Sequence, residues 1–242
     1  TVREDRSRTS LNLPGRQEEL LKAVCATGKP VVLVLLDGRA SSINYAAAHV
    51  PAILHAWFPG EFCGQAVAEA LFGDYNPGGR LAVTFPKSVG QIPFAFPFKP
   101  GSDESSSTSV YGVLYPFGHG LSYTTFSYGD LKISPLRQGV QGDINISCKI
   151  KNTGKIKGDE VVQLYLRDEV SSVTTYTKVL RGFERISLEA GEEQMVHFRL
   201  RPQDLGLWDK NMNFRVEPGK FKVMIGSSST DIRLHGRFEI AP

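Results

Sequence analysis

The sequence predicts two structural parts: part of a mostly parallel α/β sandwich domain, followed by an antiparallel β-sandwich. Helix-like and strand-like stretches alternate between residues 15 and 86, which is typical of parallel strands joined by crossover helices. From residue 130 onward, apolar residues recur with a period of two, as in half-buried strands. With 242 residues, of which 41% are hydrophobic, the chain can bury two cores of about 100 to 150 residues each. We therefore expect domains at residues 1–86 and 129–242, with an ordered connector at 87–128 between them.

The α/β part is expected to begin with a helix and a buried strand. Apolar residues at helical spacing between Leu20 and Cys25 predict the helix, and Gly28 can end it. The unbroken apolar run 31–36 predicts a strand that is covered on both faces. Ser41 or Ser42 is suited to cap the short helix that follows, because a serine hydroxyl can accept a hydrogen bond from the first helical turn.

Two further strands are expected in this part, which makes three strands with helices. Residues 52–58 predict the second strand, residues 61–72 a helix, and residues 81–85 the third strand after a turn at 76–78. Three parallel strands are half of a typical doubly wound sheet, and an uncovered apolar strand edge is prone to pairing. We therefore expect the intact gene product to begin far upstream.

The connector is rich in proline, glycine, serine and aromatic residues. Its aromatic residues are too numerous for a disordered linker, so we expect it to pack along the α/β domain. Seven short strand-like segments follow, which favour a β-sandwich of the immunoglobulin or fibronectin type III kind. These segments lie at 131–134, 144–150, 162–166, 179–186, 196–200, 220–225 and 232–240. Within the sandwich, we expect Trp208 and Phe214 to be buried where strands cross rather than to form a carbohydrate-binding surface.

Several motifs follow one another along nearly the whole chain. The most informative is YPFGHGLSYTTF at residues 115–126, which joins the two parts. The others are LNLPGRQ at 11–17, AWFPG at 56–60, LFGDYNPGGRL at 71–81, TFP at 84–86, LRGFE at 180–184, VEPGKF at 216–221 and GSSS at 226–229. In order and spacing, this series resembles bacterial β-glucosidases of glycoside hydrolase family 3.

The resemblance implies that the chain is the C-terminal portion of a retaining, exo-acting β-glycosidase, with β-glucosidase as the first choice. Such an enzyme removes terminal non-reducing β-linked sugars from an oligosaccharide or β-glycoside without a cofactor. Retaining hydrolysis needs a nucleophilic carboxylate and a carboxylic acid, roughly 5 Å apart. In the family the nucleophile is an aspartate of an N-terminal (β/α)8 barrel, which this sequence does not contain. The barrel of the same polypeptide is thus an expected partner, and the chain alone is expected to be inactive.

The general acid/base that the resemblance implies is Glu4. In the family this glutamate precedes a segment of the type Ser-Arg-Thr-x-Leu-x-Leu-Pro-Gly, which lies here at 7–15. Related sequences carry a small residue after the glutamate, whereas this chain has Asp5, so Asp5 is the fallback assignment. Arg3 and Arg6 would favour the ionised carboxylates, and burial against the barrel must therefore raise the pKa of Glu4 for it to act as an acid. The alternative is that Glu4 is a charged residue of a solvated terminus.

Arg39 and Trp57 are the candidate substrate-binding residues. Asp37, Gly38 and Arg39 follow the first predicted strand, at the carboxyl edge where open α/β sheets bind their ligands. Arg39 could hold the Glu4 loop or border the sugar site, and a structural ion pair at the strand end is the alternative. Trp57 ends the second predicted strand at the same edge and could stack on a sugar ring, with core or interdomain packing as its alternative.

Other classes of function are disfavoured. A formal net charge of +3 that is spread along the chain argues against nucleic acid binding. Cys25, Cys63 and Cys148 lie far apart in apolar stretches, as buried thiols do. The five histidines contain no pair at metal-ligand spacing, so we expect no metal site. No apolar run approaches the ~18 residues of a membrane span, and the family resemblance favours a periplasmic or secreted protein.

The alternative to an enzyme is a non-catalytic module that binds carbohydrate or another partner. It would consist of a half sheet and a sandwich without a barrel. The upstream gene sequence distinguishes the two, because a barrel that ends in the other half of the sheet favours the enzyme. The sequence indicates no oligomeric state.

Overall fold

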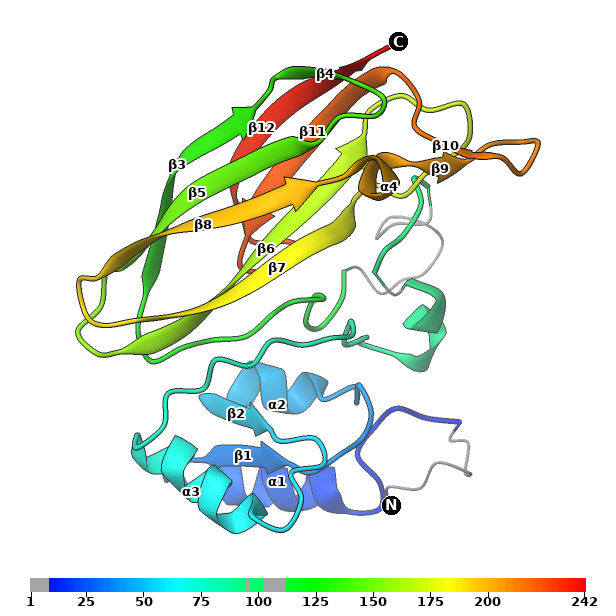
Figure 1. Cartoon of the computed structure of the whole chain (residues 1–242). Helices are drawn as coiled ribbons and strands as arrows, with labels where there is room; N and C mark the ends of the chain where they lie inside the picture. The colour runs from blue at the N-terminus through cyan, green and yellow to red at the C-terminus, as the bar shows by residue number, and fades with distance from the viewer. Residues whose placement is uncertain (1–8, 95, 102–111) are drawn as a thin grey trace. The chain divides into compact units, whose positions relative to one another are not determined.

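The computed structural model of the chain describes residues 9–94, 96–101 and 112–242 (Figure 1). Two compact units account for the described residues. The α/β unit comprises those within 1–75, 83–96 and 104–116, and the sandwich unit comprises those within 76–82, 97–103 and 117–242. Residues 76–82, which the sequence assigned to the α/β part, thus belong to the sandwich unit. The predicted boundaries at 86 and 128 stay predictions.

The α/β unit contains two parallel strands and the helices that the sequence predicts. Strand β1 pairs with strand β2 in parallel, with Leu35 opposite His55 at the end of the register. The helix and strand bounds are α1 Gln17–Cys25, β1 Val32–Leu35, α2 Asn44–His49, β2 Ala52–His55, α3 Cys63–Phe72 and the 3-10 helix η1 Val89–Phe94. A small core lies between these elements, built from Leu21, Leu35, Ile43, Ala46 and Val50.

Three details of the α/β prediction are wrong. Helix α2 begins after Ile43 without a side-chain cap, because the hydroxyls of Ser41 and Ser42 are buried and hydrogen-bonded elsewhere. Residues 81–85 form no strand, and Phe85 instead makes an isolated antiparallel bridge with Tyr115. Strand β1 is not covered on both faces in the described chain, since Val32 at one end is 49% exposed. An apolar run does not specify which segment pairs with it, so these details could not be predicted from the sequence alone.

The sandwich unit confirms all seven predicted strands and the fibronectin type III-like architecture. One sheet has the order β3-β5-β8 and the other has the order β4-β12-β11-β6-β7. All neighbours are antiparallel except β4 and β12, which are parallel. The bounds are β3 Phe126–Ser134, β4 Arg137–Gly139, β5 Ile144–Asn152, β6 Gly158–Asp168, β7 Val179–Leu188, β8 Glu193–Leu200, α4 Pro202–Leu205, β9 Leu207–Trp208, β10 Phe214–Arg215, β11 Gly219–Gly226 and β12 Ile232–Ala241.

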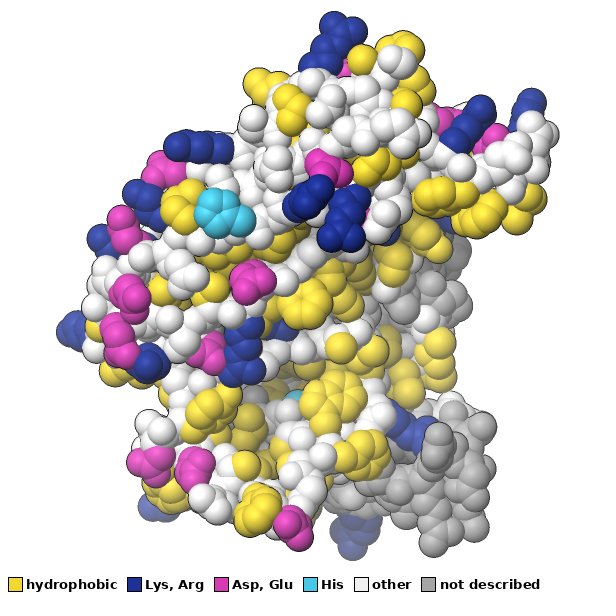
Figure 2. All heavy atoms as spheres, in the orientation of Figure 1, with side chains coloured by type: hydrophobic (Ala, Val, Ile, Leu, Met, Phe, Trp, Pro, Cys, Tyr) yellow, Lys and Arg dark blue, Asp and Glu magenta, His cyan; other side chains and the backbone are white. Residues whose placement is uncertain are grey.

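Strand alternation buries the core of the sandwich. In β5 every second residue from Ile144 to Ile150 is at most 1% exposed, including Cys148. The alternate residues point away from the core, as the period of two requires. Figure 2 shows acidic and basic side chains interspersed over the sandwich unit on the face in view.

One aromatic pair of the sandwich unit is not buried as expected. Trp208 and Phe214 lie on the short β9-β10 ribbon and are 59% and 47% exposed, with ring centroids 5.4 Å apart. The expectation that these rings are buried where strands cross is wrong, because β9 and β10 form a separate two-stranded sheet.

Candidate functional site

The carboxyl ends of β1 and β2 bring the predicted site residues of the α/β unit to one edge. The parallel register ends at Leu35 and His55, and the backbone N–H of Ala56 donates to the Leu35 carbonyl at 2.9 Å. Arg39 therefore follows β1, and Trp57 follows β2, on the same edge of the two-stranded sheet. This confirms the reasoning that placed them there, and both residues are half-buried.

The segment after β1 is fixed by its own hydrogen bonds. The Ser41 hydroxyl donates to the Asp37 carboxylate, and the Ser41 backbone N–H donates to the Arg39 carbonyl at 3.1 Å. The Ser42 hydroxyl donates to the Pro86 carbonyl at 2.9 Å, so the end of this turn is also tied to a distant part of the unit. Because Ser41 and Ser42 are 1% and 2% exposed, these bonds are shielded from water and hold the turn that carries Arg39.

Trp57 has an unusual backbone conformation. Its φ angle is +53°, in the left-handed region that a bulky side chain rarely adopts. Aromatic neighbours surround its indole: the His55 ring lies at a centroid distance of 4.2 Å and the Phe85 ring at 6.1 Å, both edge-on. Backbone strain of this kind persists only where packing overdetermines it, and it is common at functional sites.

His55 is the residue of this edge that the sequence analysis did not select. Its ring packs edge-on to Phe85 at 5.3 Å as well as to Trp57, and both ring nitrogens are buried without a hydrogen-bond partner among the described residues. Burial lowers the pKa of His55, and the Asp37 carboxylate and the Arg39 backbone act against that shift. A signal existed in the sequence, because His55 lies in the predicted strand 52–58, near the carboxyl edge at which Arg39 and Trp57 were expected.

The edge offers polar and aromatic groups to a ligand, but it contains no complete pair for glycoside hydrolysis in the described residues. The Asp37 carboxylate already accepts a hydrogen bond from Ser41, and no group of three or more metal-binding side chains occurs among the described residues. Glu4 and Asp5, the acid/base candidates, lie outside the described residues. A carboxylate pair of the kind that retaining hydrolysis needs is therefore absent from the described part of this edge.

The three cysteines are free thiols that differ in burial. Cys148 is buried, as the sequence predicts, whereas Cys25 and Cys63, which were also expected to be buried, are only half-buried. Burial raises the pKa of Cys148 to about 11, so this thiol is not a reactive nucleophile. None of the helices in the described part of the chain is long and apolar enough to cross a membrane.

Comparisons with known proteins agree with the motifs. The model of the glycosyl hydrolase family 3 C-terminal domain matches residues 1–123, and the model of the fibronectin type III-like domain matches residues 160–229. A β-xylosidase of Formosa agariphila is 45% identical over 233 residues, which are 95% of this chain and 32% of that protein. A periplasmic β-glucosidase of Salmonella typhimurium is 41% identical over 245 residues, which are 97% of this chain and 32% of that protein.

Solved structures agree with the fold. A β-glucosidase from Erythrobacter marinus has a TM-score of 0.91 and 42% identity, and the match covers 97% of this chain and 31% of that one. A β-glucosidase from Listeria innocua in complex with glucose has a TM-score of 0.91 and 33% identity, with 98% of this chain and 34% of that one covered. The chain thus spans about a third of the length of these relatives.

Proposed function

Since the chain belongs to glycosyl hydrolase family 3, we propose that it is the C-terminal part of a retaining, exo-acting β-glycosidase. The substrate is a β-linked oligosaccharide or β-glycoside, from which the enzyme removes the terminal non-reducing sugar. The observation that carries this proposal is the family match over residues 1–123, together with relatives named β-glucosidase and β-xylosidase that align with nearly the whole chain. We propose that glucose, and not xylose, is the preferred terminal sugar.

In this proposal the two catalytic carboxylates come from different parts of the polypeptide. The nucleophile belongs to an N-terminal barrel domain, and Glu4 protonates the glycosidic oxygen and later deprotonates the attacking water. The 242-residue chain by itself would hydrolyse no glycoside.

Arg39 and Trp57 would border the sugar site. Both follow parallel strands at the edge where α/β sheets bind ligands, and the turn that carries Arg39 is fixed by buried serine bonds. The left-handed backbone of Trp57 directs a large aromatic ring to a place set by His55 and Phe85. A fixed ring of this kind suits stacking on a sugar face. The location of the enzyme would be periplasmic or secreted, as the name of the Salmonella relative suggests.

The test compares Glu4→Ala with the full-length enzyme in the hydrolysis of aryl β-glucosides, with and without azide. Loss of the acid should slow substrates with poor leaving groups by about 100-fold or more, whereas substrates with good leaving groups need less protonation. Azide should then restore turnover and give a β-glucosyl azide, because a small anion can attack the glycosyl-enzyme without a general base.

The matched control is Asp5→Ala, which removes the neighbouring carboxylate. It should retain most of the activity and give no azide product. The opposite result for the two variants would move the acid/base role to Asp5. Near-normal activity of both variants would contradict the role of this segment in catalysis, and activity of the isolated 242-residue chain would contradict the division of the catalytic pair.

A further inference from the structure

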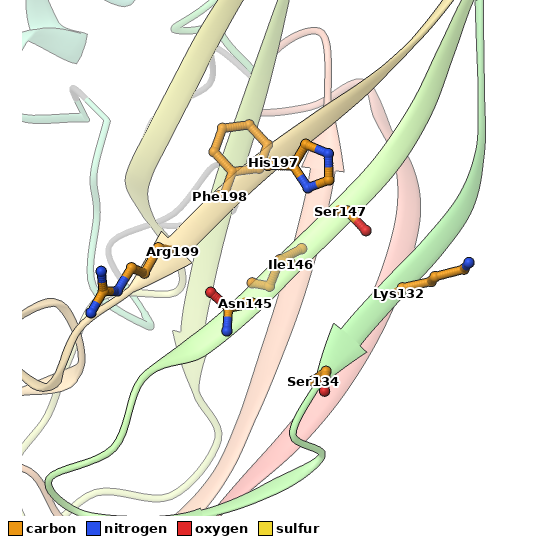
Figure 3. Close-up of a pocket in the computed structure, with 8 residues that line it drawn as sticks. All are labelled: Lys132, Ser134, Asn145, Ile146, Ser147, His197, Phe198 and Arg199. Carbon is orange, nitrogen blue, oxygen red and sulfur yellow. The ribbon is translucent and has the colours of Figure 1, made fainter.

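The outward face of the β3-β5-β8 sheet contains a shallow depression of ≈ 340 Å³ (Figure 3). Two ranks of side chains cross the three strands there. The register aligns Lys132, Ser147 and His197 in one rank and aligns Ser134, Asn145 and Arg199 in the next. The residues between them in sequence, such as Ile146, point to the core, so these six side chains share the outer face.

Most polar side chains of this face make no hydrogen bond to another described residue. Neither Lys132 nor His197, nor the side chains of Ser134, Asn145 and Ser147, makes a hydrogen bond or an ion pair within the described part of the chain. The next rank on the same face is different, because Lys149 forms ion pairs with Asp130 at 2.8 Å and Glu193 at 3.6 Å. Asp130 and Glu193 are thus paired with Lys149, whose hydrogen bond lowers the pKa of Asp130. The Lys132 ammonium group helps to lower the pKa of Asp130 but lies beyond ion-pair distance of every carboxylate in the described residues.

The arrangement of charge is uneven across the two ranks. Lys132 and Arg199 lie at diagonally opposite corners of the two ranks. Their Cα atoms are about 12 Å apart, since they are separated by two strand spacings and by two residues along the strand direction. Arg199 is held by Asp143, whose carboxylate accepts from the Arg199 Nε at 2.6 Å, but a guanidinium has further N–H groups. Between the corners lie hydroxyl, amide and imidazole groups, which both donate and accept hydrogen bonds.

We propose that this face binds an acidic saccharide, whose carboxylate contacts Lys132 and whose hydroxyl groups bond to Ser147, Asn145 and Ser134. Saccharide hydroxyls donate and accept, and they therefore match hydroxyl and amide side chains better than an inorganic anion, which chiefly accepts. Phe198 also lines the depression, but it packs against the core of the sandwich, so stacking on its ring is not the basis of recognition. Recognition consequently depends on hydrogen bonds. The bond between the Lys132 ammonium group and an ionised carboxylate, in which both partners are charged, is stronger than the bond that a neutral sugar hydroxyl would form there. This site is independent of the hydrolytic activity proposed above.

The test is a ¹H–¹⁵N NMR titration of the 242-residue chain with digalacturonic acid, its methyl ester and inorganic phosphate. Digalacturonic acid should shift the amide resonances of β3, β5 and β8 with a dissociation constant in the millimolar range. Lys132→Ala should weaken binding about tenfold, as expected for loss of one charge-assisted hydrogen bond. Lys220→Ala, which removes an exposed lysine from β11 in the other sheet, should leave binding unchanged.

Three results would overturn the proposal. The first is the absence of shifts in these strands at 20-fold excess over a millimolar dissociation constant. The second is equal binding of the methyl ester, which would mean that the carboxylate is not recognised. The third is equally tight binding of phosphate at the same resonances, which would make the face a small-anion site without selectivity for a saccharide.

Discussion

Breaking the buried ion pair between Arg80 and Glu160 should destabilise the sandwich unit far more than breaking an exposed pair. Arg80 Nη2 lies 3.3 Å from Glu160 Oε2, and the two side chains are 7% and 4% exposed. Glu160 also accepts a hydrogen bond from the Tyr128 hydroxyl at 3.0 Å, while Arg80 Nη1 donates to the carbonyls of Gly78 and Gly79, each at 3.1 Å. Arg80 Nε is buried without a hydrogen-bond partner among the described residues, so the guanidinium depends on Glu160 for its charge compensation.

The variant Glu160→Gln keeps the shape of the side chain and removes its charge. A buried cation that loses its partner destabilises a protein by about 3–5 kcal/mol. The amide oxygen of glutamine can still accept from Tyr128, so we expect the lower end of that range, about 3 kcal/mol. With roughly 2–4 °C per kcal/mol for a domain near this size, the midpoint of unfolding of the sandwich unit should fall by roughly 6 to 12 °C.

Scanning calorimetry measures this change, and Glu189→Gln is its matched control. Glu189 pairs with Lys157 at 2.7 Å, but the side chains are 64% and 62% exposed, so the control should lose less than about 1 kcal/mol. The double variant Arg80→Met/Glu160→Leu should recover most of the loss, because it leaves no buried charge. If Glu160→Gln shifts the midpoint no more than Glu189→Gln does, the guanidinium is not desolvated and the reasoning is wrong.

Two further predictions concern the same unit. Gly118 has a φ angle of +81°, and a Cβ atom there would collide with the Gln163 side chain, whereas Gly191 has the same φ angle but open space around it. Gly118→Ala should therefore lower the midpoint of thermal unfolding clearly more than Gly191→Ala does. Equal losses would show that backbone strain alone, and not the collision, is responsible. Burial raises the pKa of Asp168 to about 6 against the opposing Val170 backbone N–H, so the unfolded chain loses this proton near pH 4 and the folded chain only near pH 6. The protonated Asp168 carboxyl group therefore costs the folded state nothing below about pH 4, and the folded state loses stability as the pH rises through 6 and the buried group ionises. Asp168→Asn should raise the unfolding midpoint at pH 7.5 but not at pH 4. If the variant and the unchanged protein differ in midpoint by the same amount at both pH values, the pKa of Asp168 is not raised.

The sequence predicted the strands of the sandwich unit well, because a period of two fixes which side chains of a strand face the core. Once Ile144, Ile146 and Cys148 must face one core, their neighbours must face away, and a shift of one residue would expose the whole set. The expectation that Trp208 and Phe214 are buried was wrong, because the sequence did not show that they lie on a separate two-stranded ribbon. Exposure depends on what packs above a strand, and that is not a local property.

The edge of the α/β unit was predicted only in part. The order of strand, turn and strand was enough to bring Arg39 and Trp57 to the same edge, since parallel strands end together. The turn itself was misread, because Ser41 and Ser42 have the residue type of helix caps and instead bond to Asp37 and to the Pro86 carbonyl. A serine hydroxyl satisfies whichever partner the fold brings near, and 44 residues separate Ser42 from Pro86 in the chain.

The sequence by itself determined the family, the two kinds of periodicity and the strands of the sandwich, because motifs and alternation are properties of neighbouring residues. Only the tertiary structure decided that Phe85 bridges Tyr115 instead of extending a sheet, and that Arg80 is paired with Glu160. It also decided that the ring nitrogens of His55 are buried and that its ring packs against Trp57, whose backbone is in the left-handed region. Each of these contacts joins residues whose partners are chosen by packing and by the loss of water around buried polar groups. These contacts depend on the packing of the whole fold and therefore cannot be predicted from a short segment of the sequence.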